Sequence, residues 1–153
     1  MSKILSLVSV KGGTGKTTTT VNTGLTLASE GYRVLIIDAN LEGSNMAFHL
    51  GVSTQDVTTI HDVLRGEAKP LDAIYTHPSG LNLMMGGVDL EDMELRDRGL
   101  KEVLHEVKDE FDYVLLDCSS GLSGSVKSSI NQSNEVIIIT NPELPAVVDA
   151  YKI

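Results

Sequence analysis

The sequence predicts an α/β fold in which a mostly parallel sheet is covered by helices on both faces. Short runs rich in β-branched residues alternate with longer segments whose apolar residues have helical spacing, and this order is typical of parallel sheets. Three short runs, 34–37, 114–116 and 136–139, are apolar at every position. Continuous apolar runs of this length indicate strands that helices cover on both sides.

Five strands are predicted from the short runs. They span residues 3–10, 33–38, 81–85, 112–117 and 135–140. The first connecting helix is predicted over 16–30, where Val21 and Leu25 share one face and Gly31 provides a stop signal.

Shorter helical signals follow between the later strands. One helix is predicted to begin after Thr59 and another at Pro70, both between the second and third strands. The helix before the fourth strand has an apolar stripe made of Leu100, Val103, Leu104 and Val107. A last helix is predicted to begin near Pro145.

Length and composition indicate one domain, predicted to span 1–153. The chain has 12 Lys and Arg against 21 Asp and Glu, a net charge of −9, so nucleic acid is an unlikely partner. The single cysteine, Cys118, cannot form an internal disulfide, and the sequence begins without a leader, so we expect a cytoplasmic protein. No apolar run approaches the ~18 residues of a membrane helix.

The segment that carries chemistry is Lys-Gly-Gly-Thr-Gly-Lys-Thr-Thr, between the first strand and the first helix. Its glycines allow consecutive backbone N–H groups to surround an anion, and the following helix points its positive end there. Lys16 can reach the β and γ phosphates, and the Thr17 hydroxyl can ligate Mg²⁺. We therefore predict ATP or ADP with Mg²⁺ as cofactors, bound by Lys11, Gly12, Gly13, Thr14, Gly15, Lys16, Thr17 and Thr18.

Two aspartates follow predicted strands of the same sheet. Asp117 ends the fourth predicted strand and Asp38 ends the second. Ligands of open parallel sheets bind beyond the carboxyl ends of the strands, so both carboxylates should converge on the phosphate-binding loop. With Thr17 they form the predicted metal site, in which Asp117 holds Mg²⁺ through water.

The loop departs from the generic P-loop pattern, because Val10 stands where that pattern has glycine and Lys11 adds a second lysine. This form resembles the deviant Walker A ATPases of the MinD/ParA family, which includes the nitrogenase iron protein. Residues 36–45, 59–66, 111–117 and 140–143 resemble MinD as well, particularly its archaeal members.

The resemblance implies a P-loop NTPase fold and an ATP-bound homodimer in which Lys11 reaches the partner's phosphates. It also implies ATP hydrolysis, a protein partner of unknown identity, and a role in placing the cell division site or positioning other proteins. Lys11, Lys16, Asp38 and Asn40 would be the catalytic residues, and Gly121 would sense the γ phosphate.

Two departures from the family bear on activity. Asn40 stands where MinD proteins have an aspartate that positions the attacking water, and an amide is a much poorer proton acceptor. We therefore expect slow hydrolysis. The family also continues beyond Ile153, so we expect the C-terminal part of its fold, including the membrane helix of MinD, to be missing here; membrane contact would need that helix.

Several alternatives stay open. Asn40 is compatible with a non-hydrolysing ATP-binding regulator, and the loop is compatible with a ParA-type partition ATPase or a ligase-like relative of dethiobiotin synthetase. The remaining alternative for the loop is a glycine-rich turn that binds no ligand. Cys118 is interpreted as a buried small residue rather than half of a metal cluster. The histidines, which lack metal-ligand spacing, are expected on the surface or on helix faces: His49, His61, His77 and His105.

Overall fold

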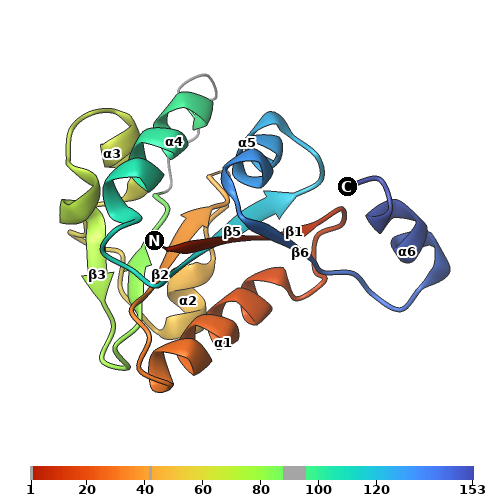
Figure 1. The fold of residues 1–153 in the computed structure, drawn as a ribbon, viewed down its shortest axis with the longest axis horizontal. Coiled ribbons are helices and arrows are strands. Elements are labelled where there is room, and N and C mark those ends of the chain that lie inside the picture. The colour runs from red at the N-terminus through yellow and green to blue at the C-terminus, as the bar shows by residue number, and fades with distance from the viewer. Residues whose placement is uncertain (1, 42, 88–95) are drawn as a thin grey trace.

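A computed structural model describes residues 2–41, 43–87 and 96–153 of the chain (Figure 1). In order along the chain, the strands are β1 (Lys3–Ser9), β2 (Val34–Ala39), β3 (Ile74–Thr76), β4 (Asn82–Met84), β5 (Tyr113–Ser120) and β6 (Glu135–Ile138). The helices are α1 (Lys16–Ser29), α2 (Met46–Leu50), α3 (Ile60–Leu64), the 3₁₀ helix η1 (Pro70–Ala73), α4 (Arg96–Val107), α5 (Gly124–Gln132) and α6 (Leu144–Ala150).

The strands form one sheet in the order β3-β4-β2-β5-β1-β6. All neighbouring pairs are parallel except β3 and β4, which are antiparallel. The mostly parallel sheet predicted from the sequence is therefore confirmed. The register places Asp38 of β2 opposite Asp117 of β5, so the two acidic residues are neighbours across the sheet.

Helices cover the sheet on both faces, which confirms the predicted layering. Along β2, Val34 and Ile36 pack in one core cluster with α1 and α2, while Leu35 and Ile37 pack in the other with α3, α4 and α5. Figure 1 shows α1 on one side of the sheet and α4 and α5 on the other. All four side chains are fully buried, as their continuous apolar run predicted.

The outermost strand β6 is an exception, and here the prediction was wrong. Val136, Ile137 and Ile138 were expected to be covered on both faces, but each is 36–44% exposed. The reason is position, because β6 pairs with β1 on one side only and forms an edge of the described sheet.

Three described elements were not predicted: α2, β3 and α5. Strand β3 is only three residues long and antiparallel, so it lacks the long apolar run by which the parallel strands were recognised. Helix α5 contains three serines and begins with Gly124, which weakens its helical signal. The strand predicted at 112–117 extends to Ser120, so Asp117 lies within β5 rather than at its end.

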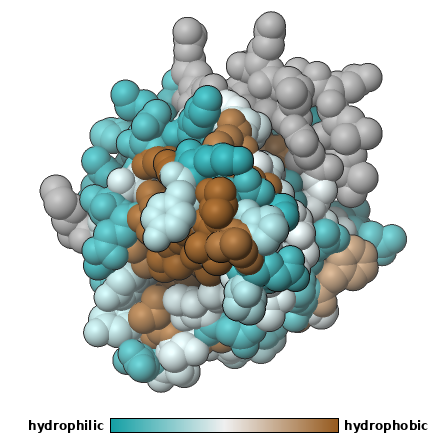
Figure 2. All heavy atoms as spheres, turned by 90° about the vertical axis from the view of Figure 1, so that its right-hand side faces the viewer, coloured by the Kyte–Doolittle hydropathy of each residue, from teal (hydrophilic) through white to brown (hydrophobic). Residues whose placement is uncertain are grey.

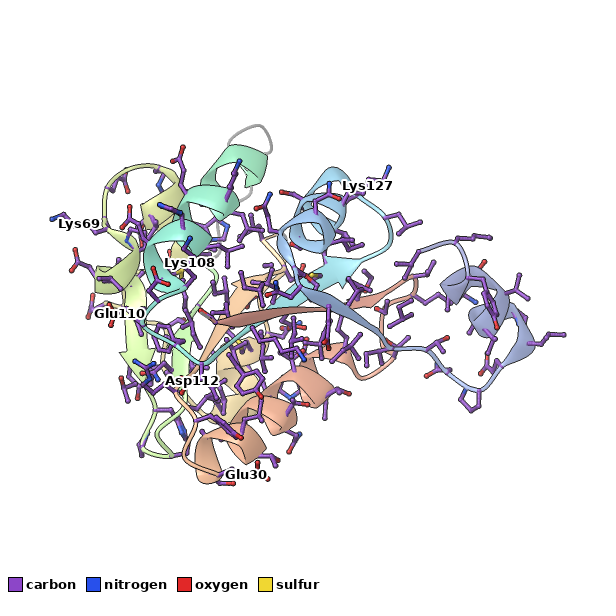
Figure 3. The ribbon with its side chains drawn as sticks, viewed as in Figure 1. Glu30, Lys69, Lys108, Glu110, Asp112 and Lys127 are labelled. Carbon is purple, nitrogen blue, oxygen red and sulfur yellow. The ribbon has the colours of Figure 1, made fainter. Side chains whose placement is uncertain are left out.

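Charged side chains surround this core, and Figure 3 shows labelled examples such as Glu30, Lys69 and Lys127 pointing away from the sheet. Apolar side chains gather on one face, which Figure 2 shows from the side that carries α6. Among the described residues, no helix is both long and apolar enough to cross a membrane.

Candidate functional site

The phosphate-binding loop connects the end of β1 at Ser9 to the start of α1 at Lys16. Gly13 and Gly15 have φ angles of 75° and 87°, which are left-handed values that other residues adopt only under strain. Gly15 is the N-cap of α1, and no side chain caps this helix end. The backbone N–H groups of the first turn are therefore available to an anion.

A pocket of about 420 Å³ lies against this loop. It is lined by seven consecutive loop and helix residues together with Ser9, the end of β5 and the segment after β2. The lining residues are Ser9, Gly12, Gly13, Thr14, Gly15, Lys16, Thr17, Thr18, Asn40, Asn45, His49 and Ser120. Seven of the eight predicted nucleotide-binding residues line the pocket, and only Lys11 lies outside the lining set.

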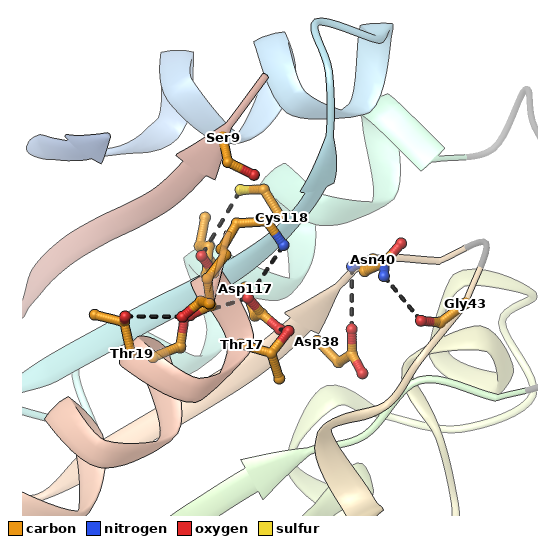
Figure 4. Close-up of polar contacts among 12 residues, drawn as sticks. Ser9, Thr17, Thr19, Asp38, Asn40, Gly43, Asp117 and Cys118 are labelled. Atoms are coloured by element: carbon orange, nitrogen blue, oxygen red, sulfur yellow. Dashed lines mark hydrogen bonds and ion pairs between the residues drawn. The ribbon is translucent and has the colours of Figure 1, made fainter. Parts of the chain in front are cut away.

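Asp117 is the centre of a buried polar network beside the loop (Figure 4). The Thr17 hydroxyl donates to Asp117 Oδ2 at 2.7 Å, and Lys16 Nζ lies 3.5 Å from Oδ1. Thr20 Oγ1 lies 3.2 Å from the same Oδ1 atom. Lys16 is 7% and Asp117 2% exposed, so the ion pair is shielded from water. The structure therefore brings together Lys16, Thr17 and Asp117, which the sequence analysis assigned to the phosphate and metal site.

Asp38 is the second buried carboxylate, with an exposed fraction of 1%. Ser44 donates a hydrogen bond to its Oδ2, and the backbone N–H of Asn40 donates to its Oδ1 at 3.1 Å. The pKa of Asp38 is raised to about 7, chiefly by burial and to a smaller extent by the charge of Asp117, against the lowering effect of the Ser44 hydrogen bond. Two buried carboxylates on neighbouring strands suit a bound cation.

Asn40 faces the pocket from the segment that follows β2. Its side-chain Nδ2 donates to the Gly43 carbonyl at 2.8 Å, so the amide is held within its own loop (Figure 4). An aspartate at this position could not make that bond, because a carboxylate has no N–H to donate.

The residues present fit a phosphate group and a hard cation. The Thr14 hydroxyl is buried beside the pocket and has no hydrogen-bond partner among the described residues, as expected of a group that awaits an acceptor. Mg²⁺ in phosphate sites is held by one or two carboxylates together with phosphate oxygens and water. Thr17, Asp38 and Asp117 provide one hydroxyl and two carboxylates for it.

Two predicted residues are placed differently from the rest of the site. Lys11 is half exposed, and its Nζ lies 3.8 Å from Asp149 Oδ2 of α6, away from the pocket. The Gly121 N–H, expected to sense a phosphate, instead donates to the Ser9 carbonyl at 2.9 Å.

Sequence reasoning missed Thr20, Ser44, Asn45 and His49. Thr20 follows the loop by one turn of α1, so its helical spacing from Lys16 was an available signal. The other three depend on how the segment after β2 folds against the loop, for which the sequence has no periodic pattern. His49 lies on α2 at the rim of the pocket.

Cys118 and His61 are both buried. Cys118 is 0% exposed in the cluster beneath α5, which agrees with a small core residue, and burial raises the pKa of its thiol to about 11. His61 was expected on the surface or a helix face. It lies on α3, on the side of the helix that is turned inward, where it is 8% exposed.

Known proteins are similar to this chain in sequence and in fold. A model of the AAA domain family matches residues 2–150. An uncharacterized ATP-binding protein of Methanocaldococcus jannaschii is 34% identical over 154 residues, which cover 100% of this chain and 58% of the relative.

Two solved structures of MinD are closely similar. The cell division ATPase MinD of Pyrococcus furiosus is 41% identical with a TM-score of 0.91, over 99% of this chain and 65% of that one. The septum site-determining protein MinD of Pyrococcus horikoshii, solved with Mg-ADP, is 40% identical with a TM-score of 0.91, over 99% and 63%. The chain spans about three fifths of the length of these relatives. It belongs to the AAA domain family, and its relatives within that family are MinD/ParA-type P-loop ATPases.

Proposed function

We propose that this chain binds Mg-ATP at the phosphate-binding loop and uses it as a dimerisation switch for placing the cell division site or positioning other proteins. The observation that carries this proposal is the buried contact of Thr17 and Lys16 with Asp117 at the edge of the pocket. In this function 1–153 acts as one domain in the cytoplasm. The names of the MinD relatives support the same role.

The residues divide the chemistry between them. Lys16 and the loop N–H groups offset charge on the phosphates, and Thr17, Asp38 and Asp117 hold Mg²⁺ and its water. Mg²⁺ supplies further neutralisation of the phosphate oxygens when it is bound. Asn40 orients the attacking water by hydrogen bonding, but it accepts a proton poorly, so turnover is slow.

Lys11 acts across the dimer in this proposal. Its ammonium group is half exposed and pairs with Asp149 at 3.8 Å, a loose contact that is easily exchanged for a phosphate. Sedimentation velocity with and without Mg-ATP tests this step. We expect a nucleotide-dependent dimer in the wild type and a monomer in Lys11→Ala; a monomer in both would contradict the switch.

Calorimetric titration with Mg-ATP tests the binding step itself. Lys16→Ala should lose the binding signal, whereas Lys127→Ala, which removes an exposed lysine that does not line the pocket, should bind as the wild type does. Thermal melting of each variant checks that it is folded. Absence of binding to the folded wild type would rule out nucleotide binding by this chain.

A second candidate is a regulator that binds ATP without hydrolysing it. The bond from Asn40 Nδ2 to the Gly43 carbonyl favours it, because it holds the side-chain amide within its own loop. Phosphate release distinguishes the two candidates: slow release supports the ATPase, and bound nucleotide that stays intact supports the regulator. Retention on nonspecific DNA at low salt would instead favour a ParA-type role.

A further inference from the structure

His61 connects two loops on either side of it. It is the second residue of α3, and its side chain is buried. The N–H of Gly87, in the segment after β4, donates to His61 Nδ1 at 2.8 Å. On the other side of the ring, Nε2 lies 3.3 Å from the carbonyl oxygen of Leu41, in the loop after β2. The imidazole therefore bridges the segments that follow two neighbouring strands.

The contact with Gly87 determines where the ring carries its proton. Gly87 presents an N–H group, so Nδ1 must accept and carries no proton in this arrangement. A neutral imidazole then has its proton on Nε2, from which it donates to the Leu41 carbonyl. The ring thus accepts from one loop and donates to the other.

The ring itself is held by the packing of α3. The helix begins with a capping box at Thr59, and the Ile60 N–H donates to the Met85 carbonyl at 2.9 Å. A Cβ on Gly87 would lie 3.3 Å from His61 Nδ1, so a glycine at this position lets the backbone approach the ring closely. The end of β4 and the start of α3 therefore form a fixed support for His61.

Hydrogen bonds join the described residues of the loop after β2 to one another and to Asp38 at the end of β2. The Asn40 N–H donates to Asp38 Oδ1 at 3.1 Å, and Asn40 Nδ2 donates to the Gly43 carbonyl at 2.8 Å. These bonds set the shape of the loop. The bond from His61 to Leu41, the residue after Asn40, ties that shape to α3 and β4.

We propose that His61 is a positioning residue: through the Leu41 carbonyl it holds the loop after β2 so that Asn40 faces the nucleotide pocket. The consequence for turnover rests on the proposed function, because only a nucleotide makes the position of Asn40 matter. The consequence for the loop does not, because the two hydrogen bonds exist in the protein alone.

Two variants separate the two bonds. In His61→Asn the side-chain oxygen takes about the position of Nδ1 and can accept from the Gly87 N–H, but the side chain is too short to reach Leu41. This variant therefore keeps the Gly87 bond and loses the Leu41 bond. The longer side chain of Gln reaches the position of Nε2, so His61→Gln keeps a donor for Leu41. Both variants carry a neutral side-chain amide, and the difference in side-chain length decides which loop remains attached.

Amide hydrogen exchange of the nucleotide-free protein is the first measurement. Losing one hydrogen bond of ordinary strength should raise exchange at Asn40 and Gly43 about fivefold in His61→Asn, with His61→Gln close to the wild type. Exchange of the β1 and β5 amides serves as the control for global stability. Equal exchange at Asn40 and Gly43 in all three folded proteins would overturn the proposal.

The tautomer of the wild-type ring provides a test that needs no variant. Nitrogen-15 spectra of labelled histidine should show His61 protonated at Nε2 and unprotonated at Nδ1. A proton on Nδ1 would overturn the proposal, even if both variants failed to fold.

Kinetics then separates this inference from the proposed function. We expect His61→Asn to release phosphate about fivefold more slowly than the wild type at unchanged Mg-ATP affinity, with His61→Gln restoring most of the rate. If the wild type does not bind Mg-ATP, the proposed function fails while the exchange result still stands. If all three proteins bind and hydrolyse ATP alike, the positioning role fails and the proposed function stands.

Discussion

The centre of the described sheet and its β6 edge differ in which side chains they bury and expose. Around β2 and β5, charged residues such as Lys16, Asp38 and Asp117 are buried and bonded to one another. Around β6 and α6, apolar side chains such as Leu144 and Val148 are 78% and 52% exposed. Burying charged side chains and exposing apolar side chains both carry a free-energy cost. Such departures from ordinary burial are typical of functional surfaces.

The difference shows what each region needs in order to be stable. The polar region is held by specific partners, so removing one partner leaves another charge or donor buried without compensation. The exposed apolar side chains of β6 and α6 do not depend on specific partners in this way, because water already covers part of them. The first region should therefore respond strongly to substitution, and the second weakly.

The largest effect is expected from Asp117→Ala. It leaves the buried Lys16 ammonium without its carboxylate and the Thr17 hydroxyl without its acceptor, which should lower the free energy of unfolding by about 3 kcal/mol. Urea titration measures this loss. Asp112→Ala, which removes an exposed carboxylate paired with Arg33, is the matched control and should cost far less. Equal losses would remove the contrast between buried and exposed charges.

Cys118 should be nearly inert, because it is fully buried in the core cluster beneath α5. Burial raises the pKa of its thiol from the ordinary 9.0 to about 11, so at pH 8 a thiol reagent should react about a hundredfold more slowly than with the unfolded chain. The same shift stabilises the fold below pH 9, and this contribution should be lost as the pH rises through about 11. Rapid labelling of the folded protein would show that solvent and the reagent reach Cys118.

Asn40→Asp tests the rate of ATP hydrolysis rather than the stability of the polar region. A carboxylate accepts a proton far better than an amide, so phosphate release should increase by at least about tenfold. Asn40→Ser, which also breaks the bond to Gly43 but adds no carboxylate, distinguishes better proton acceptance from loosening of the loop. An unchanged rate in Asn40→Asp would mean that residue 40 does not limit hydrolysis.

The smallest effect is expected on the apolar face. Replacing Leu144 and Val148 with serine should change the free energy of unfolding by no more than about 0.5 kcal/mol, because both side chains are already largely hydrated. It should also reduce the binding of an apolar dye such as anilinonaphthalene sulfonate. Val126→Ser, at a position that is 1% exposed, should instead cost at least about 2 kcal/mol. A large loss in the surface variant would mean that α6 supports the core.

Much of the site could be predicted because its parts are local. The phosphate-binding loop is a continuous segment from Lys11 to Thr18, and its glycines reveal the backbone geometry it adopts. The meeting of Asp38 and Asp117 followed from a general rule, since parallel strands bring their carboxyl ends to one edge. The contacts of Ser44 and His61 could not be predicted, because each depends on where an irregular loop settles.

The sequence by itself determined the alternation of strands and helices, the two covered faces of β2 and β5, and the loop that can surround a phosphate. Hydrophobic periodicity and glycine chemistry act over a few residues, so they can be recognised without coordinates. Only the tertiary structure decided that Lys11 pairs with Asp149, that β6 is an exposed edge, and that His61 bridges two loops. Those outcomes depend on distances between segments far apart in the chain, which packing of the whole sheet sets.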